Sequence, residues 1–129
     1  MVKHEGKIIL APGLDVWPHE LLTAKALAEA GHVVEFIPKS NVDRQKTADA
    51  LIDGTRYEMK APTSSHMPVV GKNIKKAMSQ SHCIVFDSKR MKNVKDYQVL
   101  RELQKQLAEN RKIKSLLFVD KKREVHRLK

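Results

Sequence analysis

The sequence predicts a mixed α/β fold with a mixed central β-sheet and flanking helices, and three observations lead to that class. Two apolar runs, Cys83–Asp87 and Ile113–Val119, have the length and composition of buried strands. Apolar residues recur at helical spacing in the segments before and between these runs. The Asp53-Gly54 pair lies between two β-prone runs, which is typical of a two-residue hairpin turn. The 129 residues favour a single domain spanning 1–129.

The first half of the chain contains one strand–helix–strand unit. Lys7–Ala11 is a strand candidate that ends at a Pro-Gly break. A helix is predicted from Pro18, because proline suits the first helical turn, to Gly31, because glycine commonly ends a helix. His32–Ile37 is the next strand, and Pro38–Thr47 is a polar loop before the hairpin.

The second half alternates helices and strands. In the predicted helix 69–80, the apolar stripe is Val70, Ile74, Ala77 and Met78. In the predicted helix 94–110, we expect one core-facing side to consist of Val94, Tyr97, Leu100, Leu103 and Leu107. The remaining strands are Cys83–Asp87, Ile113–Val119 and Glu124–Leu128.

The hairpin gathers charged side chains onto one face. If Asp53 and Gly54 form the turn, Ile52 pairs with Thr55, Ala50 pairs with Tyr57, and Asp49 lies opposite Glu58. Side chains alternate along a strand, so Glu58 and Lys60 share a face, while Ile52, Tyr57 and Met59 point to the other. Two carboxylates opposite each other repel unless a cation lies between them. This pattern predicts a divalent-metal site.

The charge is large and unevenly distributed. The formal net charge is +10, which favours an anionic partner, with nucleic acid first and an acidic membrane surface second. Residues 1–64 carry 8 basic and 9 acidic residues, whereas residues 65–129 carry 17 and 6. The acidic half therefore carries the candidate chemistry, and the basic half is expected to bind the polyanion. A basic solvated surface without a ligand is the alternative.

Cysteine usage and hydropathy give the expected compartment. The single cysteine, Cys83, excludes an internal disulfide and lies in an apolar strand, where a buried structural thiol is favoured over a nucleophile. No apolar run approaches the roughly 18 residues of a membrane span, and residues 1–4 open no signal-peptide core. We expect a soluble, cytoplasmic protein without a membrane partner.

Glu20 is unusual in the first predicted helix. It shares the stripe of Ala24, Leu27 and Gly31, which would face the sheet, where a carboxylate needs a partner. One interpretation is that Glu20 complements the helix dipole in the first turn. The other is that it completes the acidic cluster over the hairpin. The neighbouring His19 is either solvent-exposed or a proton shuttle.

The order of these features resembles the PD-(D/E)XK nuclease core. The residues that carry the resemblance are Glu20, Asp49, Glu58-Met59-Lys60 and, on the following helix, Gln80. A closer similarity is to the C-terminal tRNase toxin domains of contact-dependent growth-inhibition proteins (CdiA-like) and their stand-alone bacterial relatives. It spans roughly residues 18 to 128 and rests on these segments: His19-Glu20, Thr23-Ala24, Ala30 to Phe36, Ala48-Asp49, Asp53-Gly54, Glu58 to Pro62 and Gln80-Ser81. Ala48 departs from the nuclease pattern, which usually has Pro there.

The resemblance implies a nuclease that hydrolyses phosphodiester bonds, with tRNA the expected substrate and DNA not excluded. Asp49 and Glu58, with Glu20, would bind Mg²⁺ or another divalent cation through oxygen ligands. The cation would polarise the scissile phosphate and activate a water, and Lys60 would orient that water or stabilise the developing charge. Such toxins also imply a cognate immunity protein as a partner.

Three alternatives stay open. Some toxin tRNases are similar to the barnase/colicin-type fold, which cuts RNA without metal. In that version His19, Lys60 and the Thr63 hydroxyl would drive attack by the ribose 2′-hydroxyl through general acid–base catalysis. The second alternative is a nucleic-acid-binding module without turnover. The third is a structural protein whose acidic face pairs with a basic partner.

Nucleic-acid binding is predicted for basic residues of the second half. Few aromatic residues are available for base stacking, so folded RNA or a duplex recognised by shape fits better than an extended single strand. Contacts to backbone phosphates would supply affinity without sequence choice. The candidates are Lys72, Lys75, Lys76, Lys89, Arg90 and Lys92.

Overall fold

The computed structural model describes residues 6–38 and 48–129 of the chain, with only the backbone for residues 48 and 49. The polar loop expected at Pro38–Thr47 lies outside the described residues apart from Pro38, which belongs to a strand. The chain forms two compact units, 1–57 and 58–129. The hydrogen-bonded strand order is β1-β2-β3-β4-β5-β6-β7, and β4 contributes to both units. That the two units act as one nuclease-like domain stays a prediction.

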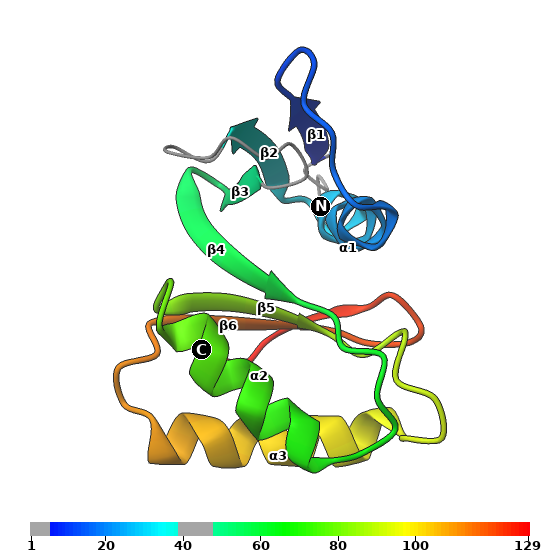
Figure 1. Ribbon diagram of the computed structural model, residues 1–129, viewed down its shortest axis with the longest axis vertical. Coiled ribbons are helices and arrows are strands. Elements are labelled where there is room, and N and C mark those ends of the chain that lie inside the picture. Colours follow the sequence, from blue (N-terminus) through cyan, green and yellow to red (C-terminus); the bar gives the residue numbers. More distant parts are fainter. Residues whose placement is uncertain (1–5, 39–47) are drawn as a thin grey trace, which may run out of the picture. The chain divides into compact units, whose positions relative to one another are not determined.

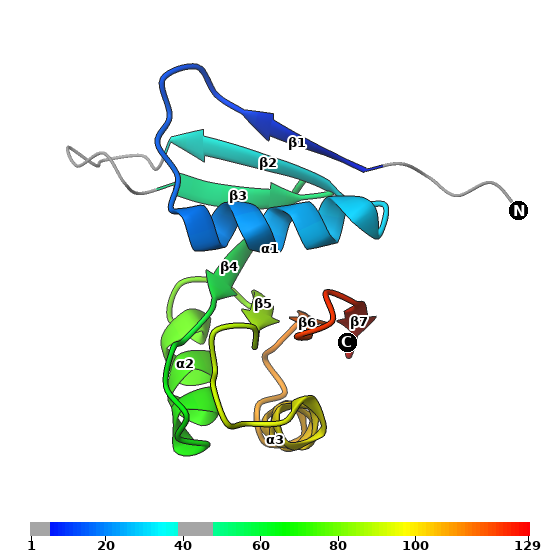
Figure 2. The same cartoon turned by 90° about the vertical axis from the view of Figure 1, so that its right-hand side faces the viewer.

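The first unit packs one helix on a small mixed sheet (Figure 2). Its elements are β1 (Lys7–Leu10), α1 (Pro18–Glu29), β2 (Val33–Pro38), β3 (Ala48–Ile52) and the start of β4 (Thr55–Lys60). β1 pairs with β2 in parallel, and β2 pairs with β3 antiparallel. Ala24 and Leu27 of α1 are fully buried, as are Val34, Phe36 and Ile52 of the strands. The helix therefore buries its small apolar stripe, as the sequence predicts.

The Asp53-Gly54 turn between β3 and β4 is confirmed. Asp53 has φ +52° and Gly54 has φ +85°, the positive values that both central residues of a type I′ turn need. Ile52 pairs with Thr55 and Ala50 with Tyr57, as expected. The Asp53 carboxylate also accepts hydrogen bonds from the backbone N–H of Val33 (2.9 Å) and contacts His32 Nδ1 at 2.7 Å. These contacts hold the turn against the start of β2.

The second unit is a parallel core with an antiparallel edge. It comprises the end of β4, α2 (Pro68–Met78), β5 (Cys83–Asp87), α3 (Asp96–Glu109), β6 (Ser115–Val119) and β7 (Val125–Arg127). β4, β5 and β6 pair in parallel, and β7 pairs antiparallel with β6. Figure 1 shows α2 and α3 side by side against one face of β5 and β6. The carboxyl ends of the three parallel strands therefore meet at one edge, where ligands of open α/β sheets commonly bind.

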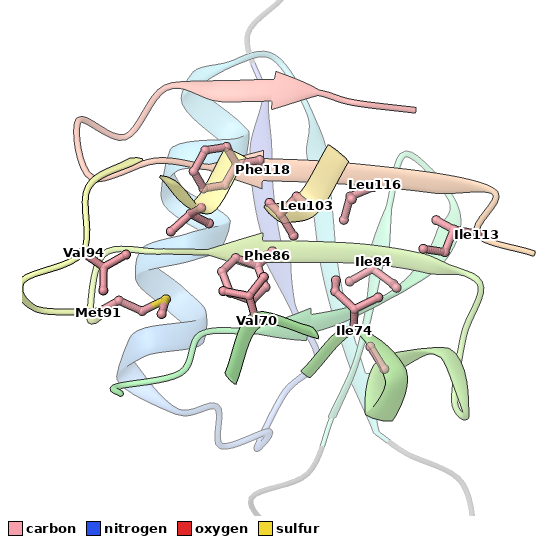
Figure 3. Close-up of a cluster of buried hydrophobic side chains, with 12 residues drawn as sticks. Val70, Ile74, Ile84, Phe86, Met91, Val94, Leu103, Ile113, Leu116 and Phe118 are labelled. Carbon is pink, nitrogen blue, oxygen red and sulfur yellow. The ribbon is translucent and has the colours of Figure 1, made fainter. Parts of the chain in front are cut away.

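The core of this unit lies between the helices and the sheet (Figure 3). Phe86 of β5 and Phe118 of β6 meet Val70 and Ile74 of α2 and Leu103 of α3, all at most 1% exposed. Truncating one of these phenylalanines to alanine is expected to cost about 3–5 kcal/mol. This core holds the strands that carry the charged residues described below.

Several details differ from the sequence-based expectations. Tyr97 is 56% exposed and lies 5.9 Å from the Arg101 guanidinium, so its expected place in the core is wrong. The buried residues of α3 are Val99, Leu103 and Gln106, and the predicted Leu100 and Leu107 are partly buried against the core. Cys83 is only half-buried, so the expectation of a buried thiol is also wrong. Element ends shift by one to two residues, as is usual.

The mixed α/β class is confirmed, with three helices in the described part of the chain. Neither a PD-(D/E)XK core nor the barnase-type alternative follows from the class alone, so both stay predictions. Within residues 6–38 and 48–129, no helix is both long and apolar enough to cross a membrane.

Candidate active site

Glu58 and Lys60 share one face of β4 in the second unit. Lys60 Nζ lies 3.9 Å from Glu58 Oε1, and the two side chains are only 16% and 18% exposed. In the parallel pairing of β4 with β5, Glu58 lies beside Ile84 and Lys60 lies beside Phe86. The expectation that the two side chains share a face is confirmed. An ammonium beside a half-buried carboxylate is the arrangement that the Glu-x-Lys spacing predicts.

The chain after β4 is tied to the chain after β5. The Arg90 guanidinium donates from Nε to the Ala61 carbonyl oxygen at 3.0 Å, and its second nitrogen contacts the same oxygen. Lys89 donates its backbone N–H to Asp87 Oδ1 at 2.9 Å. Arg90, a predicted phosphate contact, therefore helps to fix the strand end that carries Lys60. Lys89 and Lys92 are exposed in the same loop.

Glu20 and Asp49 belong to the first unit. Glu20 is half-buried in the first turn of α1, where its N–H donates to the carbonyl of Trp17 at 3.0 Å. His19 is half-buried beside it and stacks on the Trp17 ring. The backbone of Asp49 pairs with Ile37 in the β2–β3 ladder. The convergence of Glu20 and Asp49 with Glu58 and Lys60 stays a prediction.

The other predicted residues lie on the surface of the second unit. Thr63 is exposed in the loop between β4 and α2, and Gln80 is exposed two residues after α2 ends. Lys72, Lys75 and Lys76 are all exposed on α2, as the sequence predicts. Lys75 and Lys76 lie in the last turn of α2, which leads to the amino end of β5, whereas Lys89, Arg90 and Lys92 follow its carboxyl end. The six basic residues therefore form two groups.

A second charged region, which the sequence analysis did not identify, lies beyond the carboxyl ends of β5 and β6. The Asp87 carboxylate accepts two hydrogen bonds from the Arg123 guanidinium, at 2.9 and 2.8 Å, and is 5% exposed. His126 Nε2 lies 2.8 Å from Asp120 Oδ2, and Asp120 Oδ1 accepts the backbone N–H of Glu124 at 2.9 Å. One ligand atom each of Asp120, Glu124 and His126 lie within 4.8 Å of one another, so this group could hold a metal ion.

The surroundings of Asp120 lower the pKa of its carboxyl group. Burial works against the charged form, but the hydrogen bonds from His126 and from the Glu124 N–H outweigh it and hold the pKa of Asp120 below its usual range. A lowered pKa in the folded state stabilises the fold above the ordinary carboxyl pKa. That contribution is lost as the pH falls through the lowered value.

Part of this second region was visible in the sequence. Glu124 and His126 are two residues apart on a predicted strand, so they share a face, and Asp120 directly follows the preceding buried strand. A turn between the two strands brings Asp120 towards both. The Asp87–Arg123 pair joins residues 36 apart and had no comparable local signal.

The fold of the chain is similar to that of one chain in a solved bacterial protein complex. A "CdiA-CT/CdiI toxin and immunity complex from Burkholderia pseudomallei" contains a chain with 18% sequence identity and a TM-score of 0.61. The similarity covers 97% of each chain, and at this identity it shows a common fold. A comparison with curated protein sequences gave no match.

The family follows from the sequence match. Residues 46–125, more than half of the chain, match the "Contact-dependent growth inhibition CdiA C-terminal domain". The chain therefore belongs to this family of toxin domains. Toxins of this family are generally nucleases.

Proposed function

We propose that this chain is a toxin nuclease that hydrolyses phosphodiester bonds of RNA, with tRNA as the first candidate substrate. The observation that carries the proposal is the Glu58–Lys60 pair, 3.9 Å apart and half-buried on one strand face, in a chain of the CdiA C-terminal family. Phosphoryl chemistry needs a fixed cation near the oxygens on which negative charge develops. Lys60 supplies that cation.

Lys60 and the carboxylates take different roles in this mechanism. The Lys60 ammonium contacts a non-bridging oxygen of the scissile phosphate and stabilises the charge that builds up during attack. Glu58 orients Lys60, and together with Asp49 and Glu20 it would hold Mg²⁺. The donor set fits a hard cation, because carboxylate oxygens are the ligands that Mg²⁺ prefers and Glu58 is half-buried. When bound, the cation would polarise the phosphate and provide an activated water.

The place of Asp49 in this set rests on the hairpin. The register of three consecutive pairs, from Ile52–Thr55 to Ala50–Tyr57, is the one that the sequence predicts. Asp49 and Glu58 are the next residues on either side of the last pair. We therefore keep Asp49 as the proposed partner of Glu58.

The metal-free alternative uses Lys60 as well, with His19 as a proton carrier and Thr63 as a hydroxyl donor. Thr63 is exposed in a loop, and His19 stacks on Trp17. The metal-assisted version is the proposal, because Glu58 places a half-buried carboxylate beside Lys60, and the requirement for metal distinguishes the two.

A cognate immunity protein is the proposed protein partner. The similar chain from Burkholderia pseudomallei belongs to a toxin and immunity complex. A nuclease toxin also needs an inhibitor in the cell that makes it. The exposed basic residues on α2 and after β5 offer surface for nucleic acid or for an acidic inhibitor.

The proposed function is tested by incubating the purified chain with bulk tRNA and, separately, with plasmid DNA. Each substrate is offered with Mg²⁺ and with EDTA. We expect discrete tRNA fragments with Mg²⁺ and none with EDTA. Cleavage that is unaffected by EDTA would favour the metal-free version. Binding of tRNA without cleavage under any divalent cation would show a binding module in place of an enzyme.

The two aspartates of the hairpin provide a matched pair of variants. Asp49→Asn is expected to abolish cleavage, because it removes a proposed metal ligand while keeping the shape of the side chain. Asp53→Asn is expected to keep most activity, because Asn-Gly forms the same turn and its amide oxygen can still accept the Val33 N–H. Cleavage rates of both variants check this. The reverse order of activities would show that the catalytic face is assigned wrongly.

Salt dependence tests the proposed binding residues on α2. Replacing Lys72, Lys75 and Lys76 together by alanine removes three exposed charges. If each contacts one phosphate, the log–log slope of affinity against salt should fall by about 0.7–0.9 per lysine. Affinity for tRNA is measured at several salt concentrations. The lysines are replaced in a chain that also carries Asp49→Asn, which is expected to prevent cleavage of the tRNA during the measurement. An unchanged slope would place the binding surface elsewhere, with the loop after β5 as the next candidate.

A further inference from the structure

We propose that the turn between β6 and β7 is a second metal site, separate from the Glu58 face, in which Asp120, Glu124 and His126 bind one transition-metal ion of the Zn²⁺ class. The three residues are close in sequence and all belong to the second unit. Figure 2 shows the two strands that bring them together. The proposal is independent of the proposed nuclease function.

The backbone of this turn holds the three side chains in place. Val119 pairs with Val125 and Phe118 with His126, so the two strands fix both ends of the turn. Within it, the Asp120 N–H donates to the Glu124 carbonyl at 3.0 Å, and the Glu124 N–H donates to Asp120 Oδ1 at 2.9 Å. The His126 ring stacks on Phe118, with 5.6 Å between ring centres. The orientation of His126 is therefore set by packing as well as by hydrogen bonding.

The distances suit a small metal ion. Zinc bonds to nitrogen and carboxylate oxygen are about 2.0–2.2 Å, so neighbouring ligand atoms of a tetrahedral ion lie about 3.3 Å apart. Asp120 Oδ2 and His126 Nε2 are 2.8 Å apart, and the Glu124 carboxylate completes a group within 4.8 Å. Binding thus needs only small side-chain movements, and it leaves one position open for water, as in zinc sites with three protein ligands.

A cation would stabilise the two neighbouring carboxylates of Asp120 and Glu124. Two carboxylates this close together repel each other unless a positive charge lies between them. Arg123, which lies in the same turn, is bound to Asp87 by two hydrogen bonds and is turned to that partner. The Glu124 carboxylate makes no hydrogen bond or ion pair with the part of the chain that the structure describes. It is therefore available to bind an ion.

The ligand types select the class of metal. An imidazole nitrogen with two carboxylates suits Zn²⁺ and its neighbours in the first transition row, whereas Mg²⁺ prefers an all-oxygen set with several waters. A metal ion bound to His126 Nε2 would replace the present contact of this nitrogen with Asp120 Oδ2. The consequence of metal binding would be a tighter turn and a more stable β7, which has only three residues.

The proposal is tested with metal-free protein that carries no affinity tag. Isothermal titration calorimetry with ZnCl₂ at neutral pH should show that one ion binds per chain. The melting temperature of the protein should rise with zinc concentration. Glu124→Gln and His126→Gln should each weaken binding at least tenfold. His126→Gln keeps a donor for the Asp120 carboxylate, so the folded turn is retained while the metal ligand is lost. His82→Gln, which changes an exposed histidine outside the turn, is the matched control and should bind zinc like the wild type.

Competition and mapping make the outcome decisive. Millimolar Mg²⁺ should not displace the zinc, and the backbone NMR signals of residues 120–126 should shift on zinc binding. Absence of one-to-one binding would overturn the proposal. Zinc binding that is unchanged in both Glu124→Gln and His126→Gln would overturn it as well.

Discussion

Replacing Lys60 by methionine is expected to lower the rate of RNA cleavage by at least about 10²–10³-fold. Methionine keeps the length and apolar stem of lysine but removes the ammonium that would stabilise negative charge on the scissile phosphate. The Lys60–Glu58 contact is a partly exposed pair at 3.9 Å, so its loss should cost only about 0–1 kcal/mol of folding free energy. Single-turnover cleavage of tRNA measures the effect on chemistry.

The matched control for this variant is Lys89→Met, which removes one exposed ammonium from the same unit. It should reduce substrate affinity slightly and leave the single-turnover rate at saturation unchanged. Circular dichroism of both variants verifies the fold. If Lys60→Met cleaves tRNA within a few-fold of the wild-type rate, Lys60 has no part in catalysis.

Replacing Asp87 by asparagine is expected to give the largest loss of stability among the charged residues of the second unit. The Asp87 side chain is 5% exposed, and it binds the Arg123 guanidinium through both oxygens. Removing one partner of a buried pair leaves the other charge without compensation, which costs about 3–5 kcal/mol. Arg123 is 21% exposed and can gain some water, so we expect about 3 kcal/mol. Urea unfolding at neutral pH gives the value.

Asp96→Asn is a suitable comparison. Asp96 accepts hydrogen bonds from the Ser88 hydroxyl and the Lys121 N–H, and its side chain is 28% exposed. The asparagine amide can keep at least one of these hydrogen bonds. Asp96→Asn should therefore lose clearly less folding free energy than Asp87→Asn. An unfolding free energy of Asp87→Asn within 1 kcal/mol of the wild type would show that the buried pair does not stabilise the fold.

Local signals predicted a large part of the fold. The Asp53-Gly54 turn, with its positive φ values, was visible because few residues other than Gly, Asn and Asp adopt that conformation. The shared face of Glu58 and Lys60 followed from the two-residue period of a strand. The start of α1 at Pro18 and the buried stripe of α2 likewise depend on residues within one or two turns.

The features that the sequence did not predict depend on packing between residues far apart in the chain. Tyr97 fits the apolar spacing of α3, but it is 56% exposed in the first turn of the helix, whereas Val99 and Leu103 are fully buried. Cys83 lies in an apolar run yet begins β5, where the strand is less covered than at Ile84 and Val85. The Asp87–Arg123 pair depends on a turn between β6 and β7 that no local pattern places beside β5.

The candidate site was predictable to the same degree. The Glu58–Lys60 pair is local, and the structure confirms its geometry. Asp49 was predicted from the hairpin register and Glu20 from its place on the stripe of the first helix, and the resemblance joined both to Glu58 and Lys60. The family match supports that resemblance in its coarser form, as a CdiA C-terminal toxin. The roles of Glu20 and Asp49 as metal ligands stay predictions, because they depend on contacts between distant parts of the sequence.

The most direct test of the nuclease account is the cleavage of tRNA by Glu58→Gln beside the wild type, in Mg²⁺, at equal protein concentration and with the fold of each verified. The variant keeps the size of the side chain and removes only the carboxylate charge next to Lys60. The account predicts fragments from the wild type and a rate at least about 10²-fold lower from Glu58→Gln. Equal cleavage by both proteins, or none by the wild type, would contradict it.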